Sequence, residues 1–592
     1  MLLTSGVARE SWLEIIDGSA PLLLIAPHGG RAGAAARATL HPKVNDLETA
    51  AIARELARRL DACALINSAM DRNDLDCNRL AQLTARAPWM LDLIAERVEH
   101  IADRRGRAIV LLIHGWNVIE PRVDFGLGLR ERGGQLHPPA GAHVSASDEF
   151  INGPVSALAT RLRDAGIAAT FGMRYPGGAR QNLLQLFTAR HSHSDLPAVK
   201  RLAALARANA IDALQLEMSV AVRLPGPLRA RGLDAIIETF RPVATDQRHG
   251  PALDAATTDG ARGGRVVIRH AEPAAPPAAT PGETHANGAA PGSTPIRFGV
   301  EFYDRAAGLG AIASFDLGDG GAGGRIMALF DRCHAALFTA EGRPTRHAGT
   351  ITLGPLRLAL DGGRGTLAFR GPAVVVADGA AYLSVENAIA GGSLDHAMTL
   401  EATLEFDRDP DLESASAAFG RLVGEIVIAG RRRRLDAVAR IGASLTGFGA
   451  ARFETRRTLW ACCDRAAPYA AVEVCEIVTT DRDAHRTARI LTPGAGWRDC
   501  APGPIELDSA APAAAPSRIT TTLTPAAHAS APLAASVDHF MTLSRPGPDG
   551  VRIHTTLGFA SFRIGAAAGS GMFESSRIAG RPAPDAGLTR KS

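Results

Sequence analysis

Two histidines in the N-terminal part of the chain are placed where an α/β fold binds metals and substrates. His28 follows the apolar run LLLIAP and precedes two glycines, and His114 follows AIVLLI and precedes another glycine. Ligands of α/β sheets bind beyond the carboxyl ends of the strands, where glycine lets the backbone approach them closely. Because a single histidine at a strand end is more often a packing residue, it is the pair that predicts a metal site.

The segment NDLET, at residues 45–49, offers a carboxylate as third ligand. Hydrolytic zinc sites commonly use two histidines and a carboxylate and keep a fourth position open. Asp46 and Glu48 are both candidates, although acidic residues also favour the first turn of a helix for its dipole alone. We prefer Asp46, since a place at or before the helix N-cap directs its side chain toward the strand ends, and Glu48 is the alternative.

Two further polar features could bind and activate a substrate. The run RNDLDCNR, at residues 72–79, contains Arg79, whose guanidinium can hold a carboxylate by two hydrogen bonds, and Asn78 and Arg72, which add donors. A solvated loop with a salt-bridge network is the alternative. Glu217 ends the apolar run DALQL, a position that suits either a general base acting on water or a purely structural carboxylate.

The elements that carry these residues alternate between apolar runs and amphipathic stretches, from Trp12 to about Phe240. Such alternation predicts an α/β domain with a largely parallel sheet at residues 1–240. Residues 241–295 interrupt this alternation, and their segment AEPAAPPAATPGETHANGAAPGSTP, at 271–295, is rich in Pro, Ala and Gly and contains almost no large apolar side chain. They are therefore predicted to be a linker.

Beyond residue 296 the pattern changes to alternation with a period of two, punctuated by glycine, which predicts a β-rich region. The pattern G-x-x-x-F-E-x-x-R begins at Gly449 and again at Gly569, an offset of 569 − 449 = 120 residues. Together these features predict two β units, at 296–415 and 416–582. The Ala- and Pro-rich stretch at 505–530 is predicted to be an insertion in the second unit.

Composition excludes several classes of protein. Lys and Arg (65) nearly balance Asp and Glu (61), for a net charge of +4, so we expect no nucleic-acid partner. No apolar run approaches the roughly 18–20 residues that cross a bilayer, and no secretory signal is visible at the N-terminus. We therefore expect a cytoplasmic protein without a membrane span.

The five polar segments together resemble the N-formylglutamate amidohydrolase family. Its members show a strand-end Pro-His-Ser/Gly-Gly step, an acidic residue opening the next helix, an Arg-x-x-x-Asp-x-Asn-Arg run, a strand-end His-Ser/Gly and a late Gln-x-Glu strand. The counterparts here, in the same order, are PHGG at 27–30, NDLET at 45–49, RNDLDCNR at 72–79, HGW at 114–116 and QLEMS at 215–219. The resemblance covers about residues 12–240, and RNDLDCNR is its most specific part.

The resemblance implies a zinc amidohydrolase with the α/β/α fold of the zinc carboxypeptidases. The substrate would be a small molecule with a carboxylate, an N-formyl or N-acyl amino acid. Arg174 to Gly178 loosely echo the family's Gly-Gly loop on the substrate side. The roles implied are Zn²⁺ ligation by His28, Asp46 and His114, general base catalysis by Glu217, and substrate binding by Arg79, Asn78, Arg72, Gly177 and Gly178.

The C-terminal region resembles tandem lipocalin-like proteins related to carotenoid hydratases, on residues 424–449 and the repeated Phe-Glu step. Asp436, Arg440 and Ser444 are candidate pocket residues, or else part of a barrel wall. Leu445 stands where the family has Trp, so hydratase chemistry is not inferred. An eight-stranded barrel has room for one small apolar ligand. A non-catalytic protein whose barrels bind a lipid or isoprenoid-like ligand is therefore the alternative to the enzyme.

The linker composition leads to a first prediction. Limited proteolysis should cut within residues 241–295 first, because such a segment makes few contacts, and should release an N-terminal fragment that folds alone and keeps its metal. Mass spectrometry of the fragments and metal analysis of the purified piece check this. An insoluble or metal-free fragment 1–245 would contradict the modular interpretation.

Overall fold

The computed structural model divides the chain into two units. The first comprises Met1–Asn117 and Pro121–Glu283, and the second Val118–Glu120 and Thr284–Ser592. The residues that the structure describes are 11–31, 43–132, 134–245, 297–317, 323–331, 334–379, 385–408, 410, 417–444, 453–463, 470–479, 483–492, 496–508, 517–525, 530–546 and 552–579.

A seven-stranded mixed sheet forms the centre of the first unit, with the order β1-β3-β2-β4-β9-β5-β8 in the described residues. Strands β2, β3, β4 and β9 run parallel, whereas β1 and β5 pair antiparallel with β3 and β9. The strands are β1 (Leu13–Ile16), β2 (Leu22–Ala26), β3 (Cys63–Asn67), β4 (Ala108–Trp116), β5 (Arg122–Gly126), β8 (Ala168–Phe171) and β9 (Ile211–Ser219), with a separate hairpin of β6 (Arg130–Arg132) and β7 (Gln135–His137).

The strands β2, β3 and β9 are buried along their whole length, which is typical of parallel strands covered on both faces. Their register decides which residues meet at the carboxyl edge of the sheet. In β2 and β4, Ile25 pairs with Leu112, and in β4 and β9, His114 pairs with Glu217. Residues almost 200 positions apart in the sequence are thereby brought to one edge.

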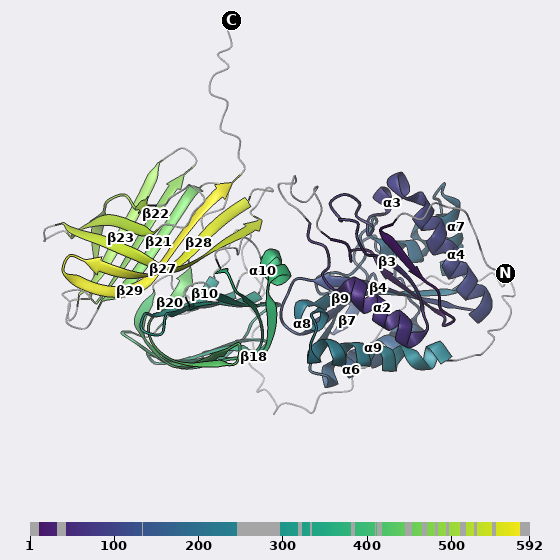
Figure 1. Cartoon of the computed structure of the whole chain (residues 1–592), viewed down its shortest axis with the longest axis horizontal. Coiled ribbons are helices and arrows are strands. Elements are labelled where there is room, and N and C mark those ends of the chain that lie inside the picture. Colours follow the sequence, from purple (N-terminus) through teal and green to yellow (C-terminus); the bar gives the residue numbers. More distant parts are fainter. Residues whose placement is uncertain are drawn as a thin grey trace, which may run out of the picture. The chain divides into compact units, whose positions relative to one another are not determined.

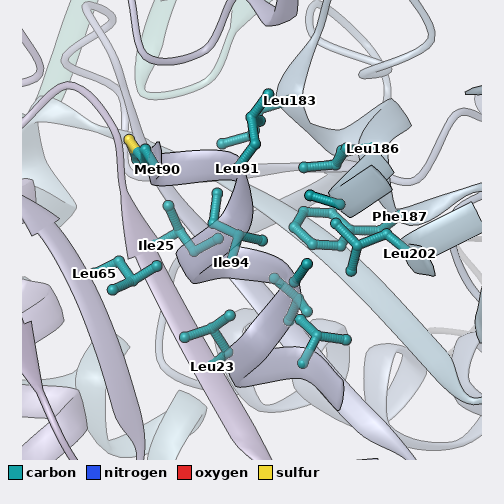
Figure 2. Packing of buried hydrophobic residues seen from close by; sticks show 14 of the residues in the cluster. Leu23, Ile25, Leu65, Met90, Leu91, Ile94, Leu183, Leu186, Phe187 and Leu202 are labelled. Carbon is teal, nitrogen blue, oxygen red and sulfur yellow. The ribbon is translucent and has the colours of Figure 1, made fainter. Parts of the chain in front are cut away.

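Helices cover both faces of this sheet (Figure 1). Helices α3, α4 and α7 pack over one face, where Leu23, Ile25 and Ile94 belong to a continuous apolar cluster (Figure 2). Helices α2 and α6 contact strands of the sheet on the other face, and α9 packs against both of these helices. The helices are α2 (Thr49–Leu60), α3 (Leu80–Arg86), α4 (Pro88–Arg105), α5 (Asp148–Phe150), α6 (Ser156–Asp164), α7 (Pro197–Arg207), α8 (Val220–Arg223) and α9 (Pro227–Thr245), with a π turn at Ile151–Val155 and 3₁₀ turns at Leu183–Phe187 and Ala189–His191.

The second unit begins with an antiparallel sheet that closes into an eight-stranded barrel. Closure comes from β13, which pairs with β17 around Leu337 and Val374, while β14, β15 and β16 extend the sheet beyond β17. The strands are β10 (Arg297–Asp304), β11 (Leu309–Asp316), β12 (Gly323–Phe330), β13 (His334–Glu341), β14 (Thr345–His347), β15 (Thr350–Leu353), β16 (Leu356–Asp361), β17 (Arg364–Val376), β18 (Ser393–Phe406), β19 (Ala418–Ile428) and β20 (Arg431–Ser444), with helix α10 (Val385–Gly391).

A second eight-stranded barrel follows, closed by pairing of β24 with β26. Its interior holds apolar side chains such as Leu459, Val474 and Phe573. The strands are β21 (Phe453–Cys463), β22 (Ala471–Thr479), β23 (Ala484–Thr492), β24 (Gly496–Pro502), β25 (Glu506–Asp508), β26 (Arg518–Pro525), β27 (Ala531–Pro546), β28 (Arg552–Ile564) and β29 (Ala567–Ala579).

The expected α/β domain followed by an all-β region is confirmed, but the boundaries inside the β region differ from those expected. Strands β19 and β20 complete the first barrel by pairing with β18 and β10, so the division falls between Ser444 and Phe453 rather than at 415/416. The stretch 505–530 contributes β25 and β26 to the second sheet and is not merely an insertion. Of the expected linker at 241–295, residues 241–245 end α9 and the rest lie outside the described residues.

The repeated nine-residue pattern does not mark two barrels. Its first copy enters β21 and its second lies in β29, and these two strands pair with each other in one sheet, Leu459 opposite Phe573. Gly449, where the first copy begins, lies outside the described residues. Every helix in the described part of the chain is too short or too polar to span a lipid bilayer.

Candidate metal centre

Three buried side chains converge at the carboxyl edge of the parallel strands. His28 follows β2, Asp46 precedes α2 and His114 lies near the end of β4. Their exposed fractions are only 1%, 5% and 2%, and the candidate ligand atoms all lie within 4.8 Å of one another. Two imidazoles and a carboxylate so placed form a possible metal site.

The spacing of these atoms suits a tetrahedral ion. Asp46 Oδ2 lies 3.3 Å from His28 Nδ1 and 3.2 Å from His114 Nδ1. Ligand atoms about 2.0–2.1 Å from a tetrahedral zinc ion are separated by roughly 3.3–3.4 Å. The residues present therefore fit a metal ion.

Asp76 orients the ring of His28. Its Oδ1 lies 2.7 Å from His28 Nε2, while the other ring nitrogen faces Asp46. A metal-binding histidine usually donates its second N–H to such an acceptor. Burial opposes ionisation of Asp76, but the hydrogen bond and charge of His28, together with Arg72 and Lys43, hold the pKa of Asp76 well below its usual value.

Asp46 is fixed as an ionised carboxylate. Its Oδ2 accepts a hydrogen bond from the backbone N–H of Gly115 at 2.9 Å. Burial opposes ionisation, yet the charges and hydrogen bonds of His28 and His114 hold the pKa of Asp46 well below its usual value. Glu48 instead adopts a left-handed backbone conformation and pairs with Arg229 Nη1 at 2.8 Å. Of the two carboxylates considered, Asp46 is therefore the one that faces the histidines.

Glu217 lies beside His114 on the neighbouring strand β9 and is also buried. Gln215, two residues earlier on the same face of β9, donates from Nε2 to Glu217 Oε1 at 2.7 Å. Burial, reinforced by the nearby carboxylates of Asp46 and Asp124, raises the pKa of Glu217 to about 8. A carboxyl group with such a pKa can take up and release a proton near neutral pH.

A cavity of about 310 Å³ opens above these residues. Arg79 is the most accessible of the predicted substrate-binding side chains, 47% exposed and 3.9 Å from Asp76 through Nε. Arg72 is less available to a substrate, because its Nη1 donates to Val44 O and to Asp46 Oδ1. The predicted site residues that line this cavity are His28, Asp46, Arg72, Asn78, Arg79, His114, Gly177, Gly178 and Glu217.

Part of the cavity wall is the loop of residues 174–179, which is held by two buried polar side chains. The carboxylate of Asp124, fully buried on β5, accepts hydrogen bonds from the backbone N–H groups of residues 173–175. The amide of Gln185 donates to the carbonyl oxygen of Gly177 at 3.0 Å. Gly177 has φ +71°, and a Cβ there would lie 2.4 Å from Leu184 Cδ2, so glycine is required.

Arg223 stabilises the backbone next to the metal centre. It is 1% exposed, and its guanidinium donates to the carbonyl oxygens of Leu47 and Trp116, which adjoin the Asp46 segment and the end of β4. A Cβ at Gly115 would lie 2.6 Å from Arg223 Cζ. The glycine after His114 therefore makes room for this arginine rather than for a ligand.

Sequence reasoning missed five supporting residues: Asp76, Asp124, Gln185, Gln215 and Arg223. Three of them carried a usable signal as charges, because Asp124 and Arg223 are charges inside apolar runs and Asp76 lies within the RNDLDCNR run. A charge that must be buried needs partners, so such positions indicate a polar site. Gln215 is the first residue of the Gln-x-Glu step at 215–217, whereas Gln185 carried no comparable signal.

Comparisons with known proteins find similarity to solved structures only. No protein-family model and no curated protein sequence matches the chain. Among solved structures, an AttH candidate from Nitrosomonas europaea is similar at 13% identity over 48% of this chain and 92% of that chain, with a TM-score of 0.31. Kievitone hydratase from Nectria haematococca is similar at 9% identity over 48% and 89%, with a TM-score of 0.32. These likenesses assign no function to this chain.

The geometry predicts one divalent metal ion per chain. His114→Ala should abolish stoichiometric metal binding without unfolding the unit, and Asp76→Asn should weaken the affinity about 10–100-fold by releasing the ring of His28. Elemental analysis and chelator competition measure both effects. His100→Ala, on the exposed side of α4, is the matched control. A wild-type protein that cannot be loaded with any divalent ion would refute the site.

Proposed function

We propose that the first unit is a zinc-dependent hydrolase that cleaves the amide bond of an N-formyl or N-acyl amino acid. The observation that carries this proposal is the buried triad of His28, Asp46 and His114 at the floor of a small cavity. The same cavity holds a buried glutamate and a partly exposed arginine. Metal, base and anion-binding group are the components that hydrolysis of such an amide needs.

Zinc is the metal that the donor set favours. Two imidazole nitrogens and one carboxylate oxygen, at tetrahedral spacing, are typical of catalytic zinc, whereas magnesium and calcium prefer oxygen ligands. When bound, zinc would supply Lewis acidity that polarises the scissile carbonyl and lowers the pKa of a water molecule. The six cysteines in the described residues lie outside this centre.

Glu217 is proposed as the general base. It faces the cavity from the strand next to His114, and Gln215 fixes one carboxylate oxygen. A carboxyl group whose pKa lies near neutral pH can both take a proton from water and return it to the leaving amine. The positive charge of a bound metal would lower that pKa and favour the ionised form from which the base acts.

Arg79 is proposed to bind the substrate carboxylate. Its guanidinium lines the cavity and is 47% exposed, so it has donors to offer, whereas Arg72 is hydrogen-bonded to Asp46. The side-chain oxygen of Asn78 accepts from Leu183 N–H at 3.1 Å and thereby fixes the cavity wall. A volume of about 310 Å³ suits a small substrate.

A non-catalytic protein whose barrels bind a lipid or isoprenoid-like ligand has less support. The complete set of metal-binding, basic and arginine side chains surrounds one cavity in the first unit. The interior of the second barrel, where such a ligand would sit, contains a cluster of the chain's own apolar side chains. The enzymatic function is therefore the better supported of the two.

The role of Glu217 can be tested directly. Glu217→Gln keeps the shape and the hydrogen-bonding capacity of the side chain but removes its basicity, so kcat should fall about 10²–10⁴-fold while the metal stays bound. Steady-state kinetics on a panel of N-formyl and N-acyl amino acids, with metal analysis of the same samples, measure this. Unchanged kcat would assign the base to another residue.

Arg79 gives a separate test. Arg79→Lys keeps the charge but loses the planar two-point contact, so KM should rise, and Arg79→Ala should raise it further. Arg58→Ala, which removes an exposed arginine of α2 outside the cavity, is the matched control. Equal kcat/KM values for a substrate and its carboxamide analogue would contradict the proposed carboxylate contact.

A further inference from the structure

A second cavity, of about 350 Å³, lies where the outer faces of the two barrels meet. From the first barrel it is lined by Glu301 on β10 and Arg440 on β20, and from the second by Trp460, Glu473 and Arg489. It belongs wholly to the second unit and shares no residue with the candidate metal centre. Its volume is within the range of roughly 300–1,000 Å³ that small-molecule sites occupy.

Strand alternation shows that these side chains point out of the barrels. Successive residues of a strand face opposite sides. The neighbours of Glu301, Val300 and Phe302, are 0% exposed. In the second barrel, Leu459 and Val474 belong to the interior cluster and adjoin Trp460 and Glu473. The cavity is therefore a feature of the interface between the barrels, not of a barrel lumen.

Four charges in the cavity wall neutralise one another. Arg440 Nη1 lies 3.5 Å from Glu301 Oε2 and its Nη2 lies 2.9 Å from Glu473 Oε1, and Arg489 Nε donates to Glu473 Oε2 at 2.7 Å. Trp460 Nε1 donates to Glu301 Oε2 at 2.7 Å. This chain of alternating charges joins the barrels and leaves little capacity for a ligand.

Two other charges of opposite sign line the cavity without an ion-pair partner among the described residues. Glu574, on β29, accepts a long hydrogen bond of 3.3 Å from the hydroxyl of Ser576. Arg456, on β21, has only the thiol of Cys475 as a side-chain hydrogen-bond partner, and sulfur is a weak acceptor. One carboxylate and one guanidinium thus remain available to a ligand.

The register of β21 and β29 arranges these groups above an apolar floor. Trp460 lies opposite Met572, and one step along the same face Thr458 lies opposite Glu574. Arg456 follows one step further. Because such steps are about 6.5–7 Å, an apolar group resting on Trp460 and Met572 would place an attached polar head beside Glu574 and Arg456.

We propose that this cavity binds a small zwitterion of the amino-acid type with a bulky apolar side chain. Its ammonium group pairs with Glu574, its carboxylate with Arg456, and its side chain packs on Trp460 and Met572. A ligand with one charge only would cover the other of these two half-buried groups without pairing it, which is unfavourable. A ligand with both charges satisfies the two residues together.

Calorimetric titration of the full-length protein with L-phenylalanine tests this proposal. We expect saturable binding that is at least about tenfold weaker for N-acetyl-L-phenylalanine, which lacks the ammonium group, and for L-phenylalanine amide, which lacks the carboxylate. Glu574→Gln and Arg456→Gln should each weaken L-phenylalanine about 10–100-fold. Glu574→Gln should also abolish the preference over the N-acetyl compound.

Two control variants locate the binding. Glu405→Gln removes an exposed charge of β18, 74% exposed, and should leave the affinity unchanged. His114→Ala disables the candidate metal centre and should also leave it unchanged. Because the first unit is itself proposed to cleave N-acyl amino acids, the N-acetyl compound is titrated on the His114→Ala chain, whereas L-phenylalanine and its amide are compared on the wild-type chain. The proposal is overturned by three results: no binding at millimolar L-phenylalanine, equal affinity for L-phenylalanine and its amide on the wild-type chain, or loss of binding in His114→Ala. The comparison with the amide needs no variant, so misfolding of a variant does not decide the outcome.

Discussion

The buried carboxylate of Asp46 is the group on which the geometry of the first unit's site depends. Burying a charge is costly unless hydrogen bonds and opposite charges surround it. Here the partners come from separate elements: His28 after β2, His114 and the Gly115 N–H at the end of β4, and Arg72 in the loop after β3. Satisfying one carboxylate therefore fixes the relative positions of three strand ends.

The parallel strands explain why residues so far apart in the chain can act together. The carboxyl ends of β2, β4 and β9 share one edge, and the pairing of His114 with Glu217 places the proposed base beside a metal ligand. Arg223, Asp124 and Gln185 add no chemistry of their own but hold the neighbouring backbone segments. The proposed metal ligands and the proposed base are thus attached to a rigid sheet. Buried polar groups hold the loops around them in place, and this arrangement favours preorganisation of the site.

Strand-end residues were predictable from the sequence because apolar runs locate strands and the residue after a run lies at the sheet edge. The choice between Asp46 and Glu48 was not decidable in this way, since it depends on the left-handed backbone at Glu48 and on its pairing with Arg229. Asp76 was missed as the partner of His28 because hydrogen bonds between segments leave no periodic signal. The repeat at Gly449 and Gly569 led to a wrong prediction for a related reason. Two strands of similar sequence can be neighbours in one sheet as readily as equivalent strands in two sheets.

The barrel architecture of the β-rich unit is not sufficient to predict what the unit binds. Alternation predicts one apolar and one polar face for each strand, and the expectation of an apolar ligand assumed that the apolar face encloses free space. In the second barrel that face carries Leu459, Val474 and Phe573, which pack against one another and form the core. The buried charges lie on the other face, where Glu301 and Arg440 meet Glu473. Such charges are costly to bury, and replacing them with apolar residues is often neutral or stabilising. Their presence between the barrels therefore indicates that this interface requires polar groups. The apolar interior of a barrel could not provide them.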